Sequence, residues 1–186
     1  MMIEISLNVL DVAENSIRAN ASLVEITVAA DTKADTLMIK IEDDGQGMTQ
    51  EQINKVEDPF FTTRTTRKVG LGVPFFKQAA ESTGGSFDIK SEPGNGTIVK
   101  AIFKLSHIDR MPLGDMEGTI YTLITFNTDT DFLYKYILDD RSFTLDTREF
   151  KEILGDVPLN APEVSSYIKE YLLENKKEVD NGKLLY

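Results

Sequence analysis

Residues 8–20 read NVLDVAENSIRAN, and their apolar periodicity predicts an amphipathic helix. Its apolar stripe recurs at intervals of three and four residues and consists of Leu10, Ala13 and Ile17. Asp11 and Asn15 lie one turn apart on the opposite, polar face. An amide oxygen there can ligate Mg²⁺, and a carboxylate one turn earlier can hold or deprotonate a water molecule. Taken alone, such a pair is more typical of solvated polar residues.

The segment 43–48 reads DDGQGM and follows a predicted strand. Its two glycines, Gly45 and Gly47, allow the backbone to approach a flat ligand closely. Asp43, at the end of the strand, can accept a hydrogen bond from an exocyclic amine. A strand-to-helix turn is the alternative interpretation, because Asp-Gly is a common turn signal.

Residues 57–72 read EDPFFTTRTTRKVGLG, show no periodicity and predict a loop. Its bases form the densest basic cluster of the chain and are Arg64, Arg67 and Lys68. Gly70, Leu71 and Gly72 then open a helix whose first turn holds Pro74. Free N–H groups and the partial positive charge at such a helix start suit a phosphate group. A solvated charged loop is the alternative, and a P-loop is excluded because no Gly-Lys-Ser/Thr follows.

The other segments before residue 106 complete an alternation of helices and strands. Thr49 and Gln52 form a capping box for a short helix that ends near Val56. Gly94-Asn95-Gly96-Thr97 by itself is typical of a hairpin turn before a strand. The strands predicted in this part are 24–28, 37–41, 86–90 and 97–105. This order predicts an α+β sandwich with helices on one face.

The composition excludes several classes of protein. With 20 Lys and Arg against 31 Asp and Glu, the 186-residue chain carries a formal net charge of −11. Such a surface repels phosphate backbones and anionic lipids, so nucleic-acid and membrane-surface binding are not expected. The chain has no cysteine and a single histidine, His107, which excludes disulfides and disfavours zinc sites. The acidic N-terminus and the lack of a long apolar run predict a cytoplasmic protein.

Four segments in order resemble the GHKL ATPase superfamily: an Asn on the first helix, D-x-G-x-G, a Gly-Leu-Gly helix entry, and G-x-G-T before a strand. This superfamily includes DNA gyrase B subunits, Hsp90 chaperones, sensor histidine kinases and MutL mismatch-repair ATPases. The resemblance covers residues 4–106 and implies a Bergerat fold, in which helices cover one face of a mixed, mainly antiparallel sheet. It also implies ATP and Mg²⁺ as ligands.

The resemblance assigns roles to individual residues. Asn15 is similar to the Mg²⁺ ligand, and Asp11 stands at the place of the catalytic acid. Asp43 is similar to the residue that recognises the adenine amino group, and Thr97 to the Thr near the adenine. The positions that match the glycines around the base, and the backbone and bases around the phosphates, are Gly45, Gly47, Arg64, Arg67, Lys68, Gly70, Leu71 and Gly72.

Within the superfamily the chain resembles two branches. An acid four residues before Asn15 is typical of MutL-type ATPases, although Asp11 is one methylene shorter than their usual Glu. Residues 59–64, PFFTTR, are similar to the ATP lid of sensor histidine kinases. His107 lacks the adjacent Glu and the helical pattern of a phosphoacceptor, so that role is not expected.

Residues 107–186 are expected to form a small α+β extension of unknown role behind a nucleotide-binding domain at 1–106. Two functions stay open. One is an Mg²⁺-dependent enzyme that hydrolyses ATP or transfers its phosphate to a regulatory protein partner; the other is a nucleotide-gated protein-binding module with negligible turnover. The oligomeric state is open, with a homodimer among the options. In the extension, strands are predicted at 119–126 and 132–138, and helices at 147–154 and 162–175.

Overall fold

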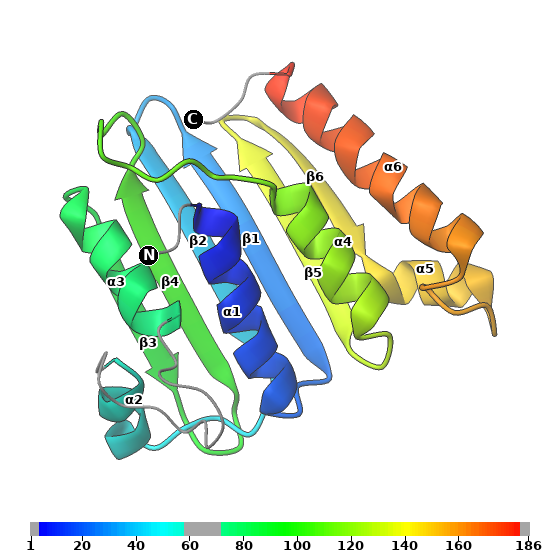
Figure 1. The fold of residues 1–186 in the computed structure, drawn as a ribbon, viewed down its shortest axis with the longest axis horizontal. Helices are drawn as coiled ribbons and strands as arrows, with labels where there is room; N and C mark the ends of the chain where they lie inside the picture. Colours follow the sequence, from blue (N-terminus) through cyan, green and yellow to red (C-terminus); the bar gives the residue numbers. More distant parts are fainter. Residues whose placement is uncertain (1–3, 58–71, 183–186) are drawn as a thin grey trace.

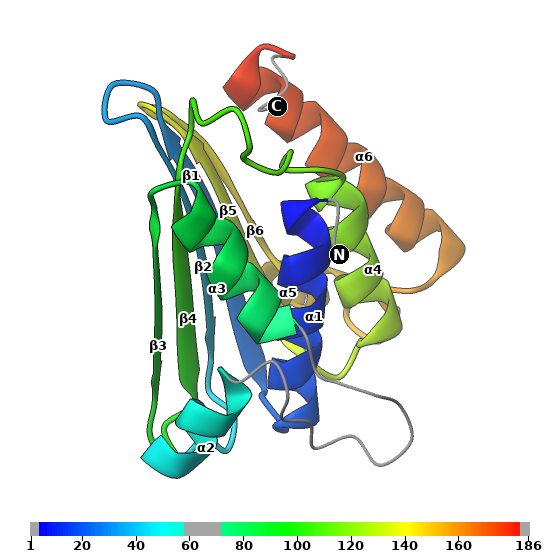
Figure 2. The ribbon, with the colours of Figure 1, turned by 60° about the vertical axis from the view of Figure 1, so that its left-hand side comes forward.

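The computed structural model describes residues 4–57 and 72–182. Their elements are α1 (Ile5–Arg18), β1 (Leu23–Asp31), β2 (Thr36–Asp43), α2 (Gln50–Val56), α3 (Gly72–Ser82), β3 (Ser86–Ser91), β4 (Thr97–Lys104), α4 (Met116–Phe126), β5 (Asp131–Leu138), β6 (Arg141–Asp146), α5 (Thr147–Leu154) and α6 (Pro162–Asp180). The strands form one sheet in the order β3-β4-β2-β1-β5-β6, with α1, α3, α4 and α6 on one face (Figures 1 and 2). Only the β1–β5 pair within these described ranges is parallel. The predicted α+β sandwich with a mixed, mainly antiparallel sheet is confirmed.

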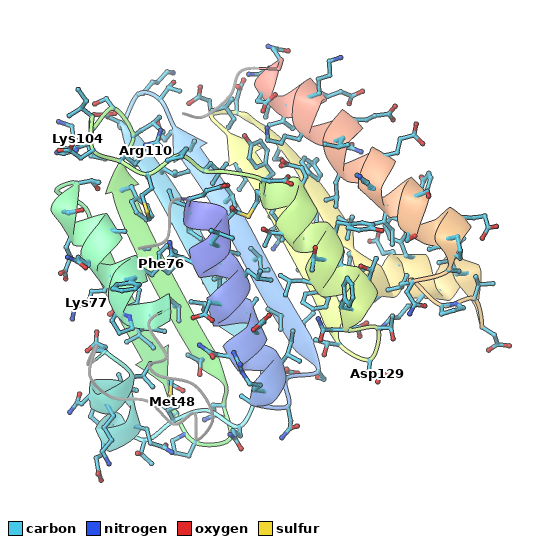
Figure 3. The ribbon with its side chains drawn as sticks, in the orientation of Figure 1. Met48, Phe76, Lys77, Lys104, Arg110 and Asp129 are labelled. Atoms are coloured by element: carbon cyan, nitrogen blue, oxygen red, sulfur yellow. The ribbon has the colours of Figure 1, made fainter. Side chains whose placement is uncertain are left out.

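Strand alternation places the polar end of β2 on the helix-covered face of the sheet. Every second side chain of β1 and β2 is buried, and the register sets Asp43 opposite Val24 of β1. Further along this face, Phe76 of α3 packs against Phe87 and Phe103, at ring-centroid distances of 6.1 and 6.0 Å (Figure 3). Asp43, the last residue of β2, therefore lies at the edge of the apolar core.

The first helix begins at Ile5, earlier than predicted, and its buried face differs from the predicted stripe. The buried side chains are Ile5, Ser6, Asn8, Val9, Val12, Ala13 and Ser16. Leu10 and Ile17 are only half-buried, because they border a groove between α1 and α4 that Phe126 also lines. The helix is thus covered on two sides, and the predicted stripe follows its flank toward α4.

The C-terminal half of the described chain extends the same sheet. β5 pairs in parallel with β1, which places Tyr134 beside Ile26 and Tyr136 beside Val28. β6 was not predicted; it pairs with β5 after a tight turn at Asp139, whose φ is 55°. The division into a domain at 1–106 and an extension at 107–186 stays a prediction, since one sheet contains strands from both.

The predicted strand at 119–126 is wrong, because this segment lies in α4. Its β-branched and aromatic residues favour a strand locally. As a helix, however, the segment packs against α1, α6 and β5, and tertiary burial outweighs the propensity difference. Asp115 caps the helix by accepting a hydrogen bond from the N–H of Gly118 at 2.9 Å. The buried apolar side chains of α4 are Met116, Ile120, Leu123 and Ile124.

Several local predictions are confirmed. The capping box of α2 is present, with the Gln52 N–H 3.3 Å from Thr49 Oγ1 and the Thr49 N–H 2.8 Å from Gln52 Oε1. The predicted helix at 147–154 is α5, and the last predicted helix is α6, which extends to Asp180.

No helix in the described ranges is long and apolar enough to cross a bilayer.

Candidate functional site

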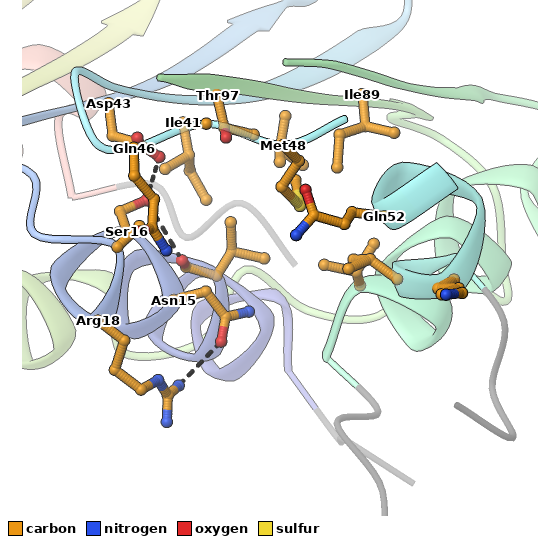
Figure 4. Close-up of a pocket in the computed structure, with 17 residues that line it drawn as sticks. Asn15, Ser16, Arg18, Ile41, Asp43, Gln46, Met48, Gln52, Ile89 and Thr97 are labelled. Carbon is orange, nitrogen blue, oxygen red and sulfur yellow. Dashed lines mark hydrogen bonds between the residues drawn. The ribbon is translucent and has the colours of Figure 1, made fainter. Parts of the chain in front are cut away.

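A cavity of about 480 Å³ opens between α1, α2, the start of α3 and the ends of β2, β3 and β4 (Figure 4). Its apolar lining residues are Val12, Ala19, Ile41, Met48, Val56, Val73, Ile89 and Val99. Its polar lining residues are Asn15, Ser16, Arg18, Asp43, Gln46, Gln52, Lys55 and Thr97. An apolar cavity with a few placed polar groups is typical of a site for a small organic ligand.

Asp43 is the buried anchor of this cavity. Its side chain belongs to a residue only 8% exposed, and both carboxylate oxygens are engaged. The hydroxyl of Ser16 donates to Oδ2 at 2.6 Å (Figure 4). The N–H of Gly45 donates to Oδ1 at 2.9 Å. A carboxylate has about four lone-pair directions, so each oxygen can accept one further hydrogen bond. The orientation of the carboxylate is therefore set before any ligand arrives.

The sequence reasoning did not identify Ser16. Its signal was available: Ser16 follows the buried positions Val9 and Val12 at helical spacing, so it is a polar residue on an apolar helix face. Because a buried hydroxyl needs a partner, this position required an acceptor on the facing strand. Asp43 is that acceptor.

Thr97 lies directly opposite Asp43 in the β2–β4 ladder and lines the same cavity. Its hydroxyl is 2.8 Å from Ser91 Oγ. Ser91 donates to the carbonyl of Gly96 at 2.7 Å and accepts from the N–H of Met48 at 2.8 Å. Since Ser91 has one hydroxyl hydrogen, Thr97 is the donor in their contact. The free lone pair of Thr97 then offers the cavity an acceptor.

Two glycines explain why the DDGQGM and GNGT segments occur together. Gly47 has a φ of +66°, and a Cβ on it would lie 1.9 Å from the carbonyl oxygen of Glu92. Gly96 has a φ of +78°, and its Cβ would lie 1.8 Å from the carbonyl oxygen of Asp43. The two loops interlock at distances that any side chain would prevent. Gly45 instead packs on the end of α1, with a Cβ position 2.9 Å from the carbonyl oxygen of Ala19.

Asn15 and Arg18 form the exposed edge of the cavity on α1. The guanidinium of Arg18 donates to Asn15 Oδ1 at 2.9 Å (Figure 4). It also lies 3.5 Å from Glu14 Oε2. Arg18 also lines the groove between α1 and α4, so it borders both hollows. The sequence reasoning missed this cation, although a base three residues after Asn15 lies on the same helix face.

The oxygen of Asn15 suits Mg²⁺ better than a metal that needs several protein ligands. No group of three or more His, Cys, Asp or Glu residues within the described ranges could hold a metal ion. Asn15 contributes one hard amide oxygen at the cavity edge. Mg²⁺ commonly takes one or two protein oxygens and completes its shell with water and phosphate oxygens, so a phosphate-bound Mg²⁺ suits this site.

Asp11 faces the first turn of α3. A Cβ on Gly72 would lie 1.8 Å from Asp11 Oδ2, so a side chain at this position would have to displace the Asp11 carboxylate. A carboxylate at a helix N-terminus is stabilised by the helix dipole. Asp11 is outside the set of described residues that line the cavity. The structure therefore gives Asp11 a packing contact, while its catalytic role stays a prediction.

Five predicted site residues lie outside the described residues: Arg64, Arg67, Lys68, Gly70 and Leu71. Gly72 is described and buried at the start of α3. A further cation, Lys55 of α2, lines the cavity and lies 2.6 Å from Glu51 Oε1. It was not predicted, because an isolated Lys on a short helix carries no distinctive pattern.

One solved structure shows a similar fold. It is described as the crystal structure of the N-terminal domain of a DNA repair protein, and it superposes with a TM-score of 0.53 over 78% of this chain and 53% of that chain. The sequence identity is 15%, so the likeness concerns the fold.

Three similar proteins are named as kinases. The chain is 27% identical over 96 residues to sporulation kinase C of Bacillus subtilis (strain 168), covering 52% of this chain and 22% of that protein. It is 35% identical over 97 residues to sensor protein kinase FleS of Pseudomonas aeruginosa, covering 52% and 24%. It is 30% identical over 107 residues to a putative sensor histidine kinase NtrY-like of Rickettsia conorii, covering 57% and 17%. The matches thus span about a fifth of these relatives' length.

The family model described as histidine kinase-, DNA gyrase B-, and HSP90-like ATPase matches residues 3–107. That range holds every element that lines the cavity. The chain belongs to this ATPase family.

Proposed function

We propose that the chain binds Mg²⁺-ATP in this cavity and uses it in a regulatory reaction, either hydrolysis or transfer of the terminal phosphate to a partner protein. Binding of ATP is what the family implies. The observation that carries the proposal for this chain is Asp43: a buried carboxylate at the wall of an apolar cavity, oriented by Ser16 and Gly45, with lone pairs left for a ligand amine.

The residues that line the cavity indicate where the adenine of ATP would bind. An aromatic base fills the space between the aliphatic residues of α1, β2 and β4, where it loses contact with water. Its exocyclic amine donates to Asp43, and Thr97 accepts from a neighbouring donor or a bound water. A base with a carbonyl at the same position would set an acceptor against the carboxylate, so the site discriminates between purines.

In the proposed complex, the phosphates of ATP lie at the exposed edge of the cavity, beside Asn15. Arg18 and Lys55 are the described cations that line the cavity. The resemblance adds Arg64, Arg67, Lys68 and the backbone of Gly70, Leu71 and Gly72. In this proposal Arg18 exchanges Asn15 Oδ1 for a phosphate oxygen, which releases the amide oxygen for Mg²⁺. When bound, Mg²⁺ supplies neutralisation of the phosphate charge.

Asp11 is the proposed base that orients or deprotonates the attacking water or acceptor. A second function is favoured by its placement: because Asp11 packs against Gly72, it can instead connect the start of α3 to α1. The chain would then act as a nucleotide-gated protein-binding module with negligible turnover.

One experiment separates these functions. The protein is incubated with γ-labelled Mg²⁺-ATP, alone and with cell extract, and free phosphate is resolved from labelled protein. An ATPase is supported if the wild type releases free phosphate, and Asp11→Asn binds ATP with the same affinity but releases none. Label on one extract protein supports a kinase. ATP binding with neither product supports the nucleotide-gated module, and turnover that is unchanged in Asp11→Asn removes Asp11 from catalysis.

A further inference from the structure

The two edge strands of the sheet, β6 and β3, have different surroundings. α6 packs against β6, and the hydroxyl of Tyr171 donates to the carbonyl of Thr144 at 3.2 Å. β3 lies at the opposite edge and pairs with β4 alone, and no described segment lies beyond it (Figure 2). The outward N–H and C=O groups of a strand in such a position can pair with another strand.

The free edge extends along most of β3. Among the described residues, the backbone of residues 86–90 makes no hydrogen bond outside the β3–β4 ladder. Phe87 and Ile89 face the helices and pack against the core, yet both are only half-buried. Val99 and Ala101, their neighbours on β4, have a strand on each side and are fully buried. A further strand at this edge would therefore complete the burial of the apolar side of β3.

The opposite side of β3 carries one charge of each sign. Asp88 and Lys90 are two residues apart on the strand, so both project from the face of the sheet that the helices leave uncovered. Their side chains are 58% and 75% exposed and lie 3.4 Å apart. Because an exposed ion pair adds little to stability, both side chains are available to other partners.

The order of these charges makes β3 complementary to a second copy of itself. A two-fold axis perpendicular to the sheet pairs the two strands in antiparallel direction and keeps each side chain on its face, so one residue stands opposite its own counterpart. Two registers align most of the strand. With Asp88 at the axis, the two Asp88 carboxylates repel each other; with Ile89 at the axis, Asp88 of each copy stands opposite Lys90 of the other.

We propose that the chain forms a dimer by antiparallel pairing of β3 with β3 of a second copy, in the register centred on Ile89. The two sheets then continue as one. Two Asp88–Lys90 pairs form on the uncovered face, and the two Ile89 side chains meet on the helix-covered face. Opposite charges and apolar side chains directly across a strand pair both favour this pairing. The occupant is a second copy because one strand supplies both members of each pair.

Sedimentation equilibrium of the full chain over a series of concentrations tests the dimer. The wild type is expected to show a monomer–dimer equilibrium. Asp88→Lys and Lys90→Asp each set like charges opposite each other in both pairs, and each is expected to raise the dissociation constant of the dimer at least about tenfold. A wild-type monomer throughout the series would overturn the proposal and leave this edge to an extended segment of another protein.

Charge complementation separates the register from a change in folding. The double variant with Asp88→Lys and Lys90→Asp exchanges the two charges, recreates both pairs and is expected to dimerise like the wild type. An equimolar mixture of the two single variants sets the lysines of one chain against the aspartates of the other. This mixture is expected to form a mixed dimer, although neither variant associates well alone. Failure of both combinations to dimerise would contradict the register.

Two controls locate the interface. Lys169→Asp changes the charge by the same amount at an exposed position of α6 and is expected to keep the wild-type dimer. In amide hydrogen exchange, residues 87–90 are expected to gain protection as the protein concentration rises, while β6 is expected to stay unchanged. Equal protection of residues 87–90 at low and high concentration, or loss of the dimer in Lys169→Asp, would reject the β3 interface.

The dimer stands independently of the proposed nucleotide chemistry. ATP would bind within one copy, so the Asp88 and Lys90 variants are expected to keep the ATP affinity of the wild type in calorimetric titration. A dimer without ATP binding would overturn the proposed function and leave the interface intact, and ATP binding by a strict monomer would do the reverse.

Discussion

Asp43 and Glu117 are two carboxylates of almost equal burial, 8% and 7% exposed, on the same face of the same sheet, and their surroundings differ. Asp43 receives hydrogen bonds at both oxygens, from Ser16 and from the backbone of Gly45. Glu117 Oε1 has no partner within the described residues, and burial raises the pKa of the Glu117 carboxyl.

The difference shows how a buried carboxylate is prepared for a ligand. Around Asp43, a hydroxyl of helix α1 and a loop N–H supply hydrogen bonds that fix the carboxylate, and the remaining lone pairs are left for a ligand in the cavity. Around Glu117, the side chains that pack from neighbouring elements enclose Oε1 without giving it a hydrogen bond among the described residues. The first arrangement suits an organic amine, whereas burial in the second raises the pKa of the Glu117 carboxyl.

The largest expected effect is on the Asp43 side. Asp43→Ala removes the proposed acceptor of the adenine amine, and we expect the ATP affinity, measured by calorimetry, to fall by about 100-fold. Asp88→Asn, on the exposed face of β3, is the control and is expected to bind like the wild type. An unchanged ATP affinity in Asp43→Ala would refute the assigned role of Asp43.

The interlocked loops that support Asp43 give the next effect. Gly47→Ala sets a methyl group 1.9 Å from the Glu92 carbonyl in a backbone with φ of +66°, and we expect the free energy of unfolding to fall by about 3 kcal/mol. Gly94→Ala is the matched control, since its φ is +82° and its Cβ meets only open space among the described residues. That variant is expected to lose about 1 kcal/mol in the same denaturant titration. Equal losses would show that the loops do not interlock.

A smaller effect is expected on the Glu117 side, as a dependence of stability on pH. Because the pKa of Glu117 is raised in the folded state, the folded protein binds the proton more tightly than the unfolded chain does. The protonated Glu117 carboxyl contributes its full stabilisation at a pH below its ordinary pKa of 4.5. This contribution is lost as the pH rises through the higher pKa of the folded state. Glu117→Gln is therefore expected to flatten the decline of unfolding free energy with pH. Parallel wild-type and variant profiles would contradict this.

The smallest expected effect concerns α4. Thr122 is half-buried in this helix, and its hydroxyl donates to the carbonyl of Gly118 at 2.7 Å. Thr122→Ala replaces a β-branched residue by the best helix former and is expected to raise the unfolding free energy by about 0.5 kcal/mol. A clear loss of stability in chemical denaturation would argue against the helix.

Residue patterns predicted the N-terminal half well, because its signals are local. Strand alternation, the Thr49–Gln52 capping box and the glycine-bearing loops each depend on a few adjacent residues. The order of the motifs also indicated the family, which the family match confirms. Ser16 and Arg18 were missed, since their roles depend on which strand or cavity faces the helix.

The C-terminal half was predicted less well, because long-range packing decides its structure. Residues 119–126 look like a strand by composition and become a helix through contacts with α1, α6 and β5. β6 needs its partner β5 to be recognisable. The charges of Lys176 and Asp180 act on Glu117, although these residues lie far apart in the chain and no local pattern links them.

The central claim, that Asp43 reads the amine of a bound adenine, is tested most directly by comparing ATP with inosine triphosphate on the unmodified protein. Inosine carries a carbonyl where adenine carries the amine, so the two ligands differ at the atom that faces Asp43. We predict that calorimetric titration in the presence of Mg²⁺ gives an affinity for ATP at least about 100-fold higher than for inosine triphosphate. Equal affinities, or no binding of ATP, would contradict the account.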